Sequence, residues 1–272
     1  MALSVRELRS TARDIYDLTA EEYLELFGPH QHDGYHVTWR ESPIEAQENL
    51  IRVMAERSEL RPGESVLDVG CGIGGTALWL EKNKGCRVTG ISNSTEQVVL
   101  ARRLARDARS AARFLQQDAE RLAVDAPVDV VLLIGALGHL ARPRDFFVRA
   151  RRVLAPGGRI AVADWFRSAE APAGALDELR ADFCMPAIET LATHATWLVE
   201  TGFELRGLDD LTANLSPRWR ISPTIVLRPA FWRLLRKLGR RTLPILRGAR
   251  AMERAVLQGW LVYGALVGRV SD

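Results

Sequence analysis

Residues 65–75 read SVLDVGCGIGG, a short apolar run that leads directly into alternating glycines. A helical pattern follows from Gly75 to Lys84. This order is typical of a buried strand that turns tightly into a helix, with main-chain atoms open to a ligand because glycine carries no side chain. Dinucleotide-binding folds use a similar turn for pyrophosphate, so the glycines alone leave the ligand open.

Asp68, two residues before the first glycine, restricts the choice of ligand. A carboxylate at this point would repel a pyrophosphate, but it would interact favourably with a cationic ligand. A nicotinamide dehydrogenase is therefore disfavoured, and a cofactor that carries a positive charge and no phosphate is favoured.

Short apolar runs alternate with helical patterns through the rest of the chain. We predict strands over residues 65–69, 87–91, 112–115, 128–134, 159–163, 202–205 and 261–267. We predict helices over residues 75–84, 94–108, 143–154, 176–191 and 196–201, with a helix stop and turn at residues 156–158 and an exposed loop at residues 171–175. This alternation predicts an α/β, Rossmann-like fold with a seven-stranded, mostly parallel sheet and helices on both faces.

The pattern also divides the chain into segments. We expect a helical leader and lid at residues 1–60, a cofactor-binding core at 61–167, a cap segment with the sixth strand at 168–212, a basic amphipathic cap insertion at 213–250, and a closing helix with the seventh strand at 251–272. The leader and the late insertions together form the predicted helical cap.

Composition narrows the class of protein. Of the 272 residues, 47% are hydrophobic and 26% are charged, which is typical of a globular protein. No apolar run approaches the roughly 20 residues of a membrane span, and the start lacks a secretory pattern, so we expect a cytoplasmic protein. The three cysteines form no CxxC pair, and no zinc or other metal site is predicted.

Later segments carry a family resemblance in the expected order. Asp118-Ala119 follows the third strand, and residues 154–160 (LAPGGRI) precede the fifth. With the glycine turn, these motifs resemble class I S-adenosylmethionine-dependent methyltransferases over roughly residues 60–206. Their cofactor, S-adenosylmethionine, carries an ammonium and a sulfonium and no phosphate, which agrees with Asp68.

Residues 90–97 (GISNSTEQ), followed by Ala101-Arg102, are similar to the branch that includes tocopherol, sterol and natural-product methyltransferases. The resemblance implies ribose or adenine contacts for Ser92 and Gln97, although the carboxylate usual after the second strand is absent. Helix capping by Ser92, Asn93 or Ser94 and a loop role for Asp118 are the structural alternatives. The predicted cofactor-binding residues are Asp68, Gly70, Cys71, Gly72, Ser92, Asn93, Gln97, Asp118, Ala119 and Gly135.

His139 is the first candidate for a catalytic base. It lies after the fourth strand, at the edge where ligands of open α/β sheets bind. The loop resembles the tocopherol-type pattern of Glu, spacer, Glu and His, with Gly135 and Gly138 in place of the carboxylates. His139 is therefore either a base or an orienting residue beside the cofactor.

The leader supplies further candidates. Tyr16 and residues 28–35 (GPHQHDGY) resemble the part of the same branch that covers cofactor and substrate. We expect Tyr16 and Tyr23 over the cofactor and His32 near the acceptor, with Tyr16 and His32 as catalytic candidates beside His139. Loop packing is the alternative for His30 and His36, and their spacing does not favour a metal.

Residues 215–254 hold ten Arg and one Lys against one Glu, so this segment has a net charge of +10. Because the whole chain has a net charge of +3, the remaining residues carry −7. Phe231, Leu234, Leu235 and Leu238 fall on one helical face. We interpret this helix as a cap; alternatives are membrane contact through residues 229–241, a phosphorylated substrate, or nucleic acid, which is not expected because no binding motif accompanies the charge.

The combined interpretation is an S-adenosylmethionine-dependent methyltransferase that acts on an apolar small molecule such as a prenylated, terpenoid or polyketide metabolite. Carbon methylation is the first choice, because sterol and tocopherol relatives methylate carbon, and oxygen or nitrogen methylation is the second. A protein that retains the cofactor and catalyses cyclisation is the alternative from another class. The sequence is compatible with a homo-oligomer.

Overall fold

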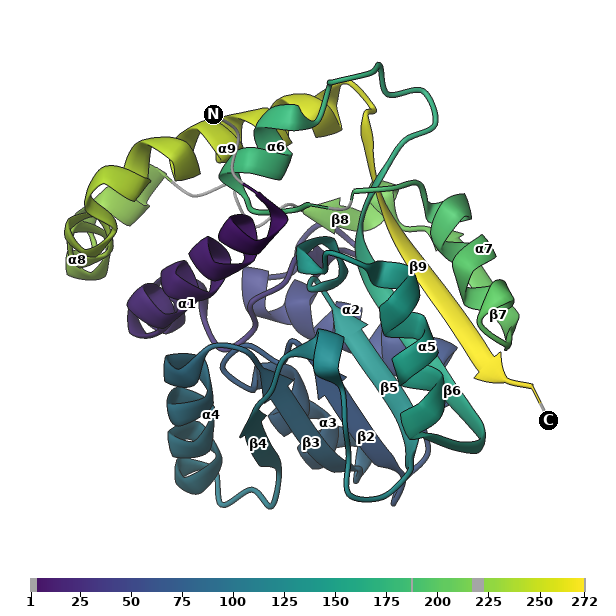
Figure 1. Cartoon of the computed structure of the whole chain (residues 1–272). Helices are drawn as coiled ribbons and strands as arrows, with labels where there is room; N and C mark the ends of the chain where they lie inside the picture. The colour runs from purple at the N-terminus through teal and green to yellow at the C-terminus, as the bar shows by residue number, and fades with distance from the viewer. Residues whose placement is uncertain (1–3, 187, 217–222, 272) are drawn as a thin grey trace.

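The computed structural model describes residues 4–186, 188–216 and 223–271. A seven-stranded sheet in the order β4-β3-β2-β5-β6-β9-β7 forms its centre (Figure 1). The strands are β2 (Ser65–Val69), β3 (Arg87–Ser92), β4 (Arg113–Gln116), β5 (Val128–Ile134), β6 (Leu154–Arg167), β7 (Phe203–Asp210) and β9 (Leu261–Val270). The strand that ends in the glycine turn, β2, is central and pairs in parallel with β3 and β5.

The sheet is parallel except at one strand. β3 pairs in parallel with β4, and β5 with β6, whereas β9 runs antiparallel to both β6 and β7. The predicted α/β fold with a seven-stranded, mostly parallel sheet is therefore confirmed. The carboxyl ends of β2, β3, β4 and β5 all meet at one edge, where open α/β sheets bind ligands.

Helices cover both faces of the sheet (Figure 1). α2 (Pro43–Arg57), α3 (Gly75–Lys84) and α4 (Thr95–Asp107) pack on one face, and α5 (Pro143–Val153) and α7 (Leu191–Glu200) on the other. Side chains alternate between the faces because successive residues of a strand point in opposite directions: Val66 joins the first core and Leu67 the second.

A helical cap lies over the carboxyl edge of the sheet (Figure 1). It contains α1 (Val5–Phe27), α6 (Asp177–Asp182), α8 (Pro229–Leu238) and α9 (Thr242–Leu257), and a small sheet of β1 (Gly34–Tyr35) and β8 (Leu215–Ser216) joins the leader to the late insertion. Short 3-10 helices are η1 (Ala119–Arg121), η2 (Leu137–His139), η3 (Thr212–Asn214), η4 (Pro223–Leu227) and η5 (Gly239–Arg241).

The structure differs from the predicted elements in several places: α7 begins at Leu191 and not at residue 196, and β7 continues to Asp210 and not to residue 205. The helix expected over residues 176–191 is only α6, which ends at Asp182, because Pro186 disfavours a helical residue before it and Cys184 adopts a positive φ of 54°. The turn expected at residues 156–158 is an irregularity inside β6, where the register shifts. The closing helix α9 begins at Thr242, inside the segment assigned to the basic insertion.

The basic amphipathic helix α8 packs on the acidic helix α1. Leu234 and Leu238 are buried in a small core with Leu26. Lys237 Nζ lies 2.8 Å from Glu22 Oε2, and an Arg233 amino group lies 2.5 Å from Glu25. Much of the charge asymmetry therefore forms ion pairs within the cap, as expected for a cap helix.

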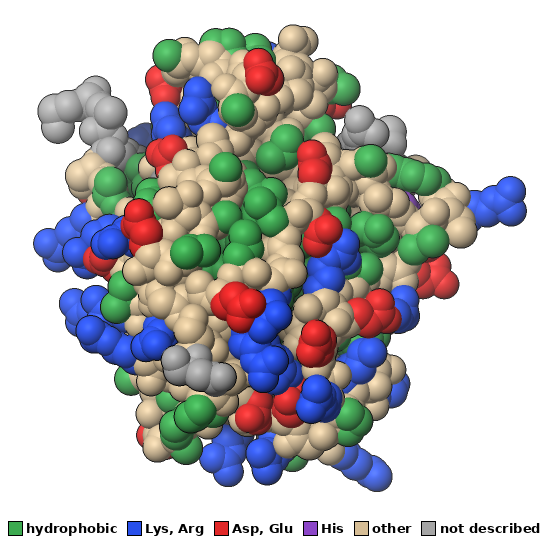
Figure 2. Space-filling model, turned by 90° about the vertical axis from the view of Figure 1, so that its right-hand side faces the viewer, with side chains coloured by type: hydrophobic (Ala, Val, Ile, Leu, Met, Phe, Trp, Pro, Cys, Tyr) green, Lys and Arg blue, Asp and Glu red, His purple; other side chains and the backbone are tan. Residues whose placement is uncertain are grey.

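Opposite charges also neighbour each other elsewhere on the surface. On the face shown in Figure 2, Lys and Arg side chains are interleaved with Asp and Glu over much of the view. Arg218 and Arg220, which contribute to the charge of the insertion, lie outside the described residues. No helix within the described ranges combines the length and apolar character needed to cross a membrane.

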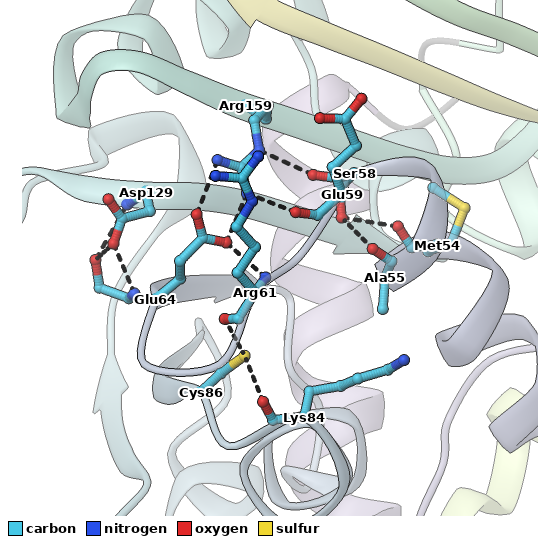
Figure 3. A network of polar contacts seen from close by, with 11 residues as sticks. Met54, Ala55, Ser58, Glu59, Arg61, Glu64, Lys84, Cys86, Asp129 and Arg159 are labelled. Atoms are coloured by element: carbon cyan, nitrogen blue, oxygen red, sulfur yellow. Dashed lines mark hydrogen bonds and ion pairs between the residues drawn. The ribbon is translucent and has the colours of Figure 1, made fainter.

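An ionic network ties the opposite edge of the sheet together (Figure 3). Arg159, near the start of β6, donates to Glu64 Oε2 at 2.6 Å and to the Ser58 carbonyl at 2.8 Å. The Arg159 and Glu64 side chains are only 15% and 17% exposed, so the pair is partly shielded from solvent. Burial acts to raise the pKa of Glu64, but the Arg159 guanidinium and the Arg61 backbone N–H together hold that pKa below its ordinary value.

We expect Arg159→Met to lower the free energy of unfolding by about 2 kcal/mol, because Glu64 and the Ser58 carbonyl lose a charged donor. Urea denaturation measures this loss, and Arg113→Met, at an exposed position of β4, is the matched control with a change within about 0.5 kcal/mol. Cofactor affinity should not change, because Arg159 lies far from the carboxyl edge. An equal loss in both variants would contradict the assigned role.

Candidate active site

The turn after β2 leaves the backbone open at the carboxyl edge. Gly70 and Gly72 adopt positive φ angles of 74° and 54°, which side-chain-bearing residues rarely adopt. The Gly70 and Cys71 N–H groups donate to the Ile91 carbonyl at 2.9 and 3.0 Å, which anchors the turn to β3. A Cβ atom on Gly70 would lie 2.4 Å from that of Ala136, so a side chain there would collide with the loop after β5.

A cavity of about 100 Å³, here called the glycine cavity, lies over this turn. All ten residues predicted to bind the cofactor line it, although they come from four separate segments of the chain. They are Asp68, Gly70, Cys71, Gly72, Ser92, Asn93, Gln97, Asp118, Ala119 and Gly135. The structure thus gathers the whole predicted set around one space.

Asp68 has an unusual environment at the base of this cavity. Its side chain is buried, with 3% exposure, and Oδ2 has no hydrogen-bond partner among the described residues. Burial raises the pKa of this carboxyl to about 7. A buried carboxylate is stabilised by a nearby cation, so the glycine cavity fits a ligand with a positive charge.

A chain of hydrogen-bonded side chains, one hydroxyl and two amides, lies along one wall of the glycine cavity. Ser92 Oγ donates to Gln97 Oε1 at 2.8 Å, and Gln97 Nε2 donates to Gln31 Oε1 at 2.6 Å. The alternative role in helix capping applies to Ser94, whose Oγ accepts from the Gln97 N–H at 3.1 Å. The resemblance placed residues 28–35 over the cofactor, but it did not single out Gln31, because no local pattern shows which of these side chains reaches Gln97.

Asp118 is held by the leader as well. Its Oδ1 accepts from an Arg9 amino group at 2.7 Å and from the Glu120 N–H at 2.9 Å, so it caps η1 and pairs with α1. Its side chain is 34% exposed at the rim of the cavity. Arg9 also lines the cavity. Sequence reasoning missed it as well, because no local sequence pattern marks it as a site residue.

A second cavity of about 220 Å³, here called the apolar cavity, lies between the sheet edge and the cap. The two cavities share Ala12, Tyr16, Gln31, His32, Gly135 and His139. Tyr23 lines only the apolar cavity, and its expected position over the cofactor stays a prediction. It lies seven residues beyond Tyr16, which is roughly 10 Å along helix α1.

His139 and Tyr16 meet at this shared wall. His139 Nδ1 lies 3.1 Å from the Cys184 carbonyl, which can only accept, so the neutral imidazole carries its proton on Nδ1. His139 Nε2 lies 3.0 Å from the Tyr16 hydroxyl and therefore accepts its proton in a hydrogen bond. Sequence reasoning did not find Cys184, whose strained backbone (φ 54°) presents the carbonyl.

Asp164 supports the loop that carries His139. Its Oδ2 accepts from the Leu137 and Gly138 N–H groups at 2.6 and 3.2 Å, and its side chain is buried. Burial raises the pKa of this carboxyl to about 6, against the effect of its backbone donors. An acid near the end of a strand, as at Asp68, is the signal that could have identified it.

Of the leader histidines, His30 and His32 have ring centroids 5.6 Å apart, and only His32 lines the glycine and apolar cavities. His32 lines both cavities and its Nδ1 donates to the Asp33 carbonyl at 2.8 Å. His30 is buried behind the start of α3, where burial lowers its pKa to about 4. His36 pairs with Glu41 and stacks on Trp39 at 4.7 Å between ring centroids, away from both cavities.

Comparisons with known proteins identify the family. Residues 67–162 match the family model described as a methyltransferase domain. The 27-O-demethylrifamycin SV methyltransferase of Amycolatopsis mediterranei (strain S699) is 33% identical over 218 residues, 75% of this chain and 77% of that protein. The chloroplastic tocopherol O-methyltransferase of Arabidopsis thaliana is 26% identical over 275 residues, 92% of this chain and 78% of that protein.

The crystal structure of the cyclase SpnF has a TM-score of 0.82 and 24% identity, and the match covers 99% of this chain and 97% of that one. At this identity the likeness shows the fold alone. The sequence matches show more: the chain belongs to the S-adenosylmethionine-dependent methyltransferases, as the resemblance implied, and S-adenosylmethionine is its cofactor.

The Asp68 carboxyl makes cofactor affinity depend on pH. With a pKa of about 7, half of the carboxyls are ionised at pH 7 but only about a tenth at pH 6, whereas an α-ammonium stays protonated below roughly pH 7.7. We expect the dissociation constant of S-adenosylhomocysteine, measured by calorimetry, to rise about fivefold from pH 7 to pH 6. Asp68→Asn should bind more weakly at pH 7 and lose this dependence; an unchanged pH dependence in the variant would contradict the role.

Proposed function

We propose that this enzyme methylates a hydroxyl oxygen of an apolar small molecule, with His139 as the base. The observation that carries the proposal is the orientation of His139 Nε2. This nitrogen is the acceptor in the neutral imidazole, and it belongs to a side chain that lines both the glycine cavity and the apolar cavity. A hydroxyl of the acceptor that is deprotonated by this nitrogen would lie where the two cavities meet.

The glycine cavity would hold S-adenosylmethionine, which supplies an electrophilic methyl group on sulfur. In this proposal the Asp68 carboxylate binds the ammonium, and the Ser92, Gln97 and Gln31 side chains lie along the ribose and adenine. Asp118 and Ala119, which also line this cavity, would hold the adenine. The fit rests on the unpartnered Asp68 oxygen and on the open backbone of the glycine turn.

The acceptor would bind in the apolar cavity with its hydroxyl near Nε2 of His139. Removal of the hydroxyl proton by Nε2 leaves an oxygen nucleophile, and the imidazolium keeps its Nδ1 hydrogen bond to the Cys184 carbonyl. Tyr16 either relays this proton or orients the oxygen, because its hydroxyl already bonds Nε2.

Oxygen replaces carbon as our preferred site of methylation. The names of the compared relatives, 27-O-demethylrifamycin SV methyltransferase and tocopherol O-methyltransferase, refer to oxygen, and both match most of this chain. A base beside the acceptor also suits a hydroxyl, whose proton must leave. Cyclisation is the second candidate, since the structurally similar SpnF is a cyclase.

Membrane contact through residues 229–241 stays a prediction. Trp232 is 60% exposed on α8, which favours contact with a lipid surface. Against this, Arg233 and Lys237 of the same helix already pair with α1. A homo-oligomer also stays a prediction.

We expect His139→Asn to lower kcat by about a hundredfold to ten-thousandfold. The asparagine amide can still donate a hydrogen bond to the Cys184 carbonyl, but it cannot remove the proton from the hydroxyl that is methylated. Affinity for S-adenosylhomocysteine should change less than about twofold, since Asp68 is untouched. Tyr16→Phe is the companion variant: it keeps the ring, frees Nε2, and should cost less than His139→Asn. Methyl transfer to a phenol, followed by mass spectrometry, gives the rates; unchanged turnover in His139→Asn would contradict its role as base.

A further inference from the structure

Helix α1 contacts the first turn of α4 beside the glycine cavity. Asp17 Oδ1, on α1, accepts from the Ser94 hydroxyl at 2.6 Å and from the Glu96 N–H at 3.1 Å. Ser94 is the N-terminal cap of α4, and it is fully buried. The first N–H groups of a helix have no partner within the helix, and a carboxylate near them is stabilised by the helix dipole. Asp17 therefore supplies a second cap for α4 from a distant segment of the chain.

Ser94 connects Asp17 to two side chains that the proposed function places along the ribose. The Ser94 N–H donates to Ser92 Oγ at 3.1 Å, and the Ser94 hydroxyl oxygen accepts from the Gln97 N–H at 3.1 Å. Ser92 and Gln97 both line the glycine cavity, whereas Asp17 is absent from the described residues that line it. An effect of Asp17 on the cofactor must therefore pass through Ser94.

A second contact joins the same two helices away from this turn. Glu21, one helical turn after Asp17 on α1, accepts from two amino groups of Arg103 at 2.7 and 2.8 Å. The Arg103 and Glu21 side chains are 46% and 49% exposed, so solvent screens this ion pair. The pair holds α1 against α4 without lining the glycine cavity, which makes it the reference for a contact whose role is structural alone.

We propose that Asp17 is a positioning residue for the cofactor: through Ser94 it fixes Ser92 and Gln97 against the ribose hydroxyls. The bond from a buried hydroxyl to a carboxylate is charge-assisted, and such bonds are shorter and stronger than neutral ones. A ribose-binding turn that is held in place before the ligand arrives loses less freedom on binding. The inference rests on the proposed function only in placing the ribose at Ser92 and Gln97.

The preference for the ribose hydroxyls tests this role. Calorimetry gives the dissociation constants of S-adenosylhomocysteine and of S-(2′,3′-dideoxyadenosyl)homocysteine, which lacks both hydroxyls. We expect the unsubstituted enzyme to bind S-adenosylhomocysteine about tenfold more tightly, or more. Asp17→Ala should reduce this preference to within about threefold by weakening S-adenosylhomocysteine, while affinity for the dideoxy ligand changes less than about twofold. A structural role alone would weaken both ligands equally and leave the preference intact.

Glu21→Ala, on the same face of α1, is the matched control and should retain the full preference. Asp17→Asn keeps an oxygen that can accept from the Ser94 hydroxyl, so it should retain the preference to within about twofold. Ser94→Ala should reduce the preference as Asp17→Ala does, and the double variant should lose no more, because the two residues act through one contact. If Asp17→Ala does not fold, Ser94→Ala provides the same comparison. A preference that survives removal of this contact would overturn the inference.

Gln97→Leu separates this inference from the proposed function. A preference lost in Gln97→Leu but kept in Asp17→Ala would leave the ribose site standing and contradict the role of Asp17. A preference lost in Asp17→Ala but kept in Gln97→Leu would have the reverse meaning. Equal binding of the two ligands by the unsubstituted enzyme would contradict both. None of these measurements depends on the acceptor.

Discussion

The tight turn after β2 is the constraint on which the active site depends. A central strand must reverse into a helix within a few residues and still present its backbone to a ligand, and the positive φ angles of Gly70 and Gly72 meet that demand. The same turn places Asp68 in the floor of the cavity, where its carboxyl is buried and Oδ2 has no described partner. Cofactor choice follows from this pairing of an open backbone with a buried negative charge.

The predicted fold, the glycine turn and the role of Asp68 came from local signals, and the rest of the cofactor-binding set came from the family resemblance. Strand periodicity, alternating glycines and an acid at a strand end are short-range patterns, and each depends on neighbours in the sequence. The resemblance to methyltransferase motifs implied that residues as distant as Asp68, Ser92 and Asp118 belong to one site, which is compatible with the carboxyl ends of parallel strands meeting at one edge. Their common cavity agrees with that reasoning.

Long-range contacts were beyond such reasoning. The resemblance placed the leader over the cofactor, but no spacing in the sequence shows that Gln31 contacts Gln97 or that Arg9 contacts Asp118. The Cys184 carbonyl meets His139 because α6 ends early, before Pro186, where helical periodicity suggested a longer helix. The basic insertion was interpreted as a cap helix, but composition gives only its charge and not the acidic face of α1 that it pairs with.

The cap and the sheet edge together define the chemistry. The sheet edge supplies Asp68 and the glycine turn, and the cap supplies Tyr16, while Cys184 and Asp164 fix the tautomer and position of His139 between the two cavities. Nitrogen-15 NMR of His139, at a pH where the imidazole is neutral, tests this arrangement most directly. The account predicts a proton on Nδ1 and an unprotonated Nε2 that accepts from Tyr16. A proton on Nε2 would contradict the assignment of His139 as the base.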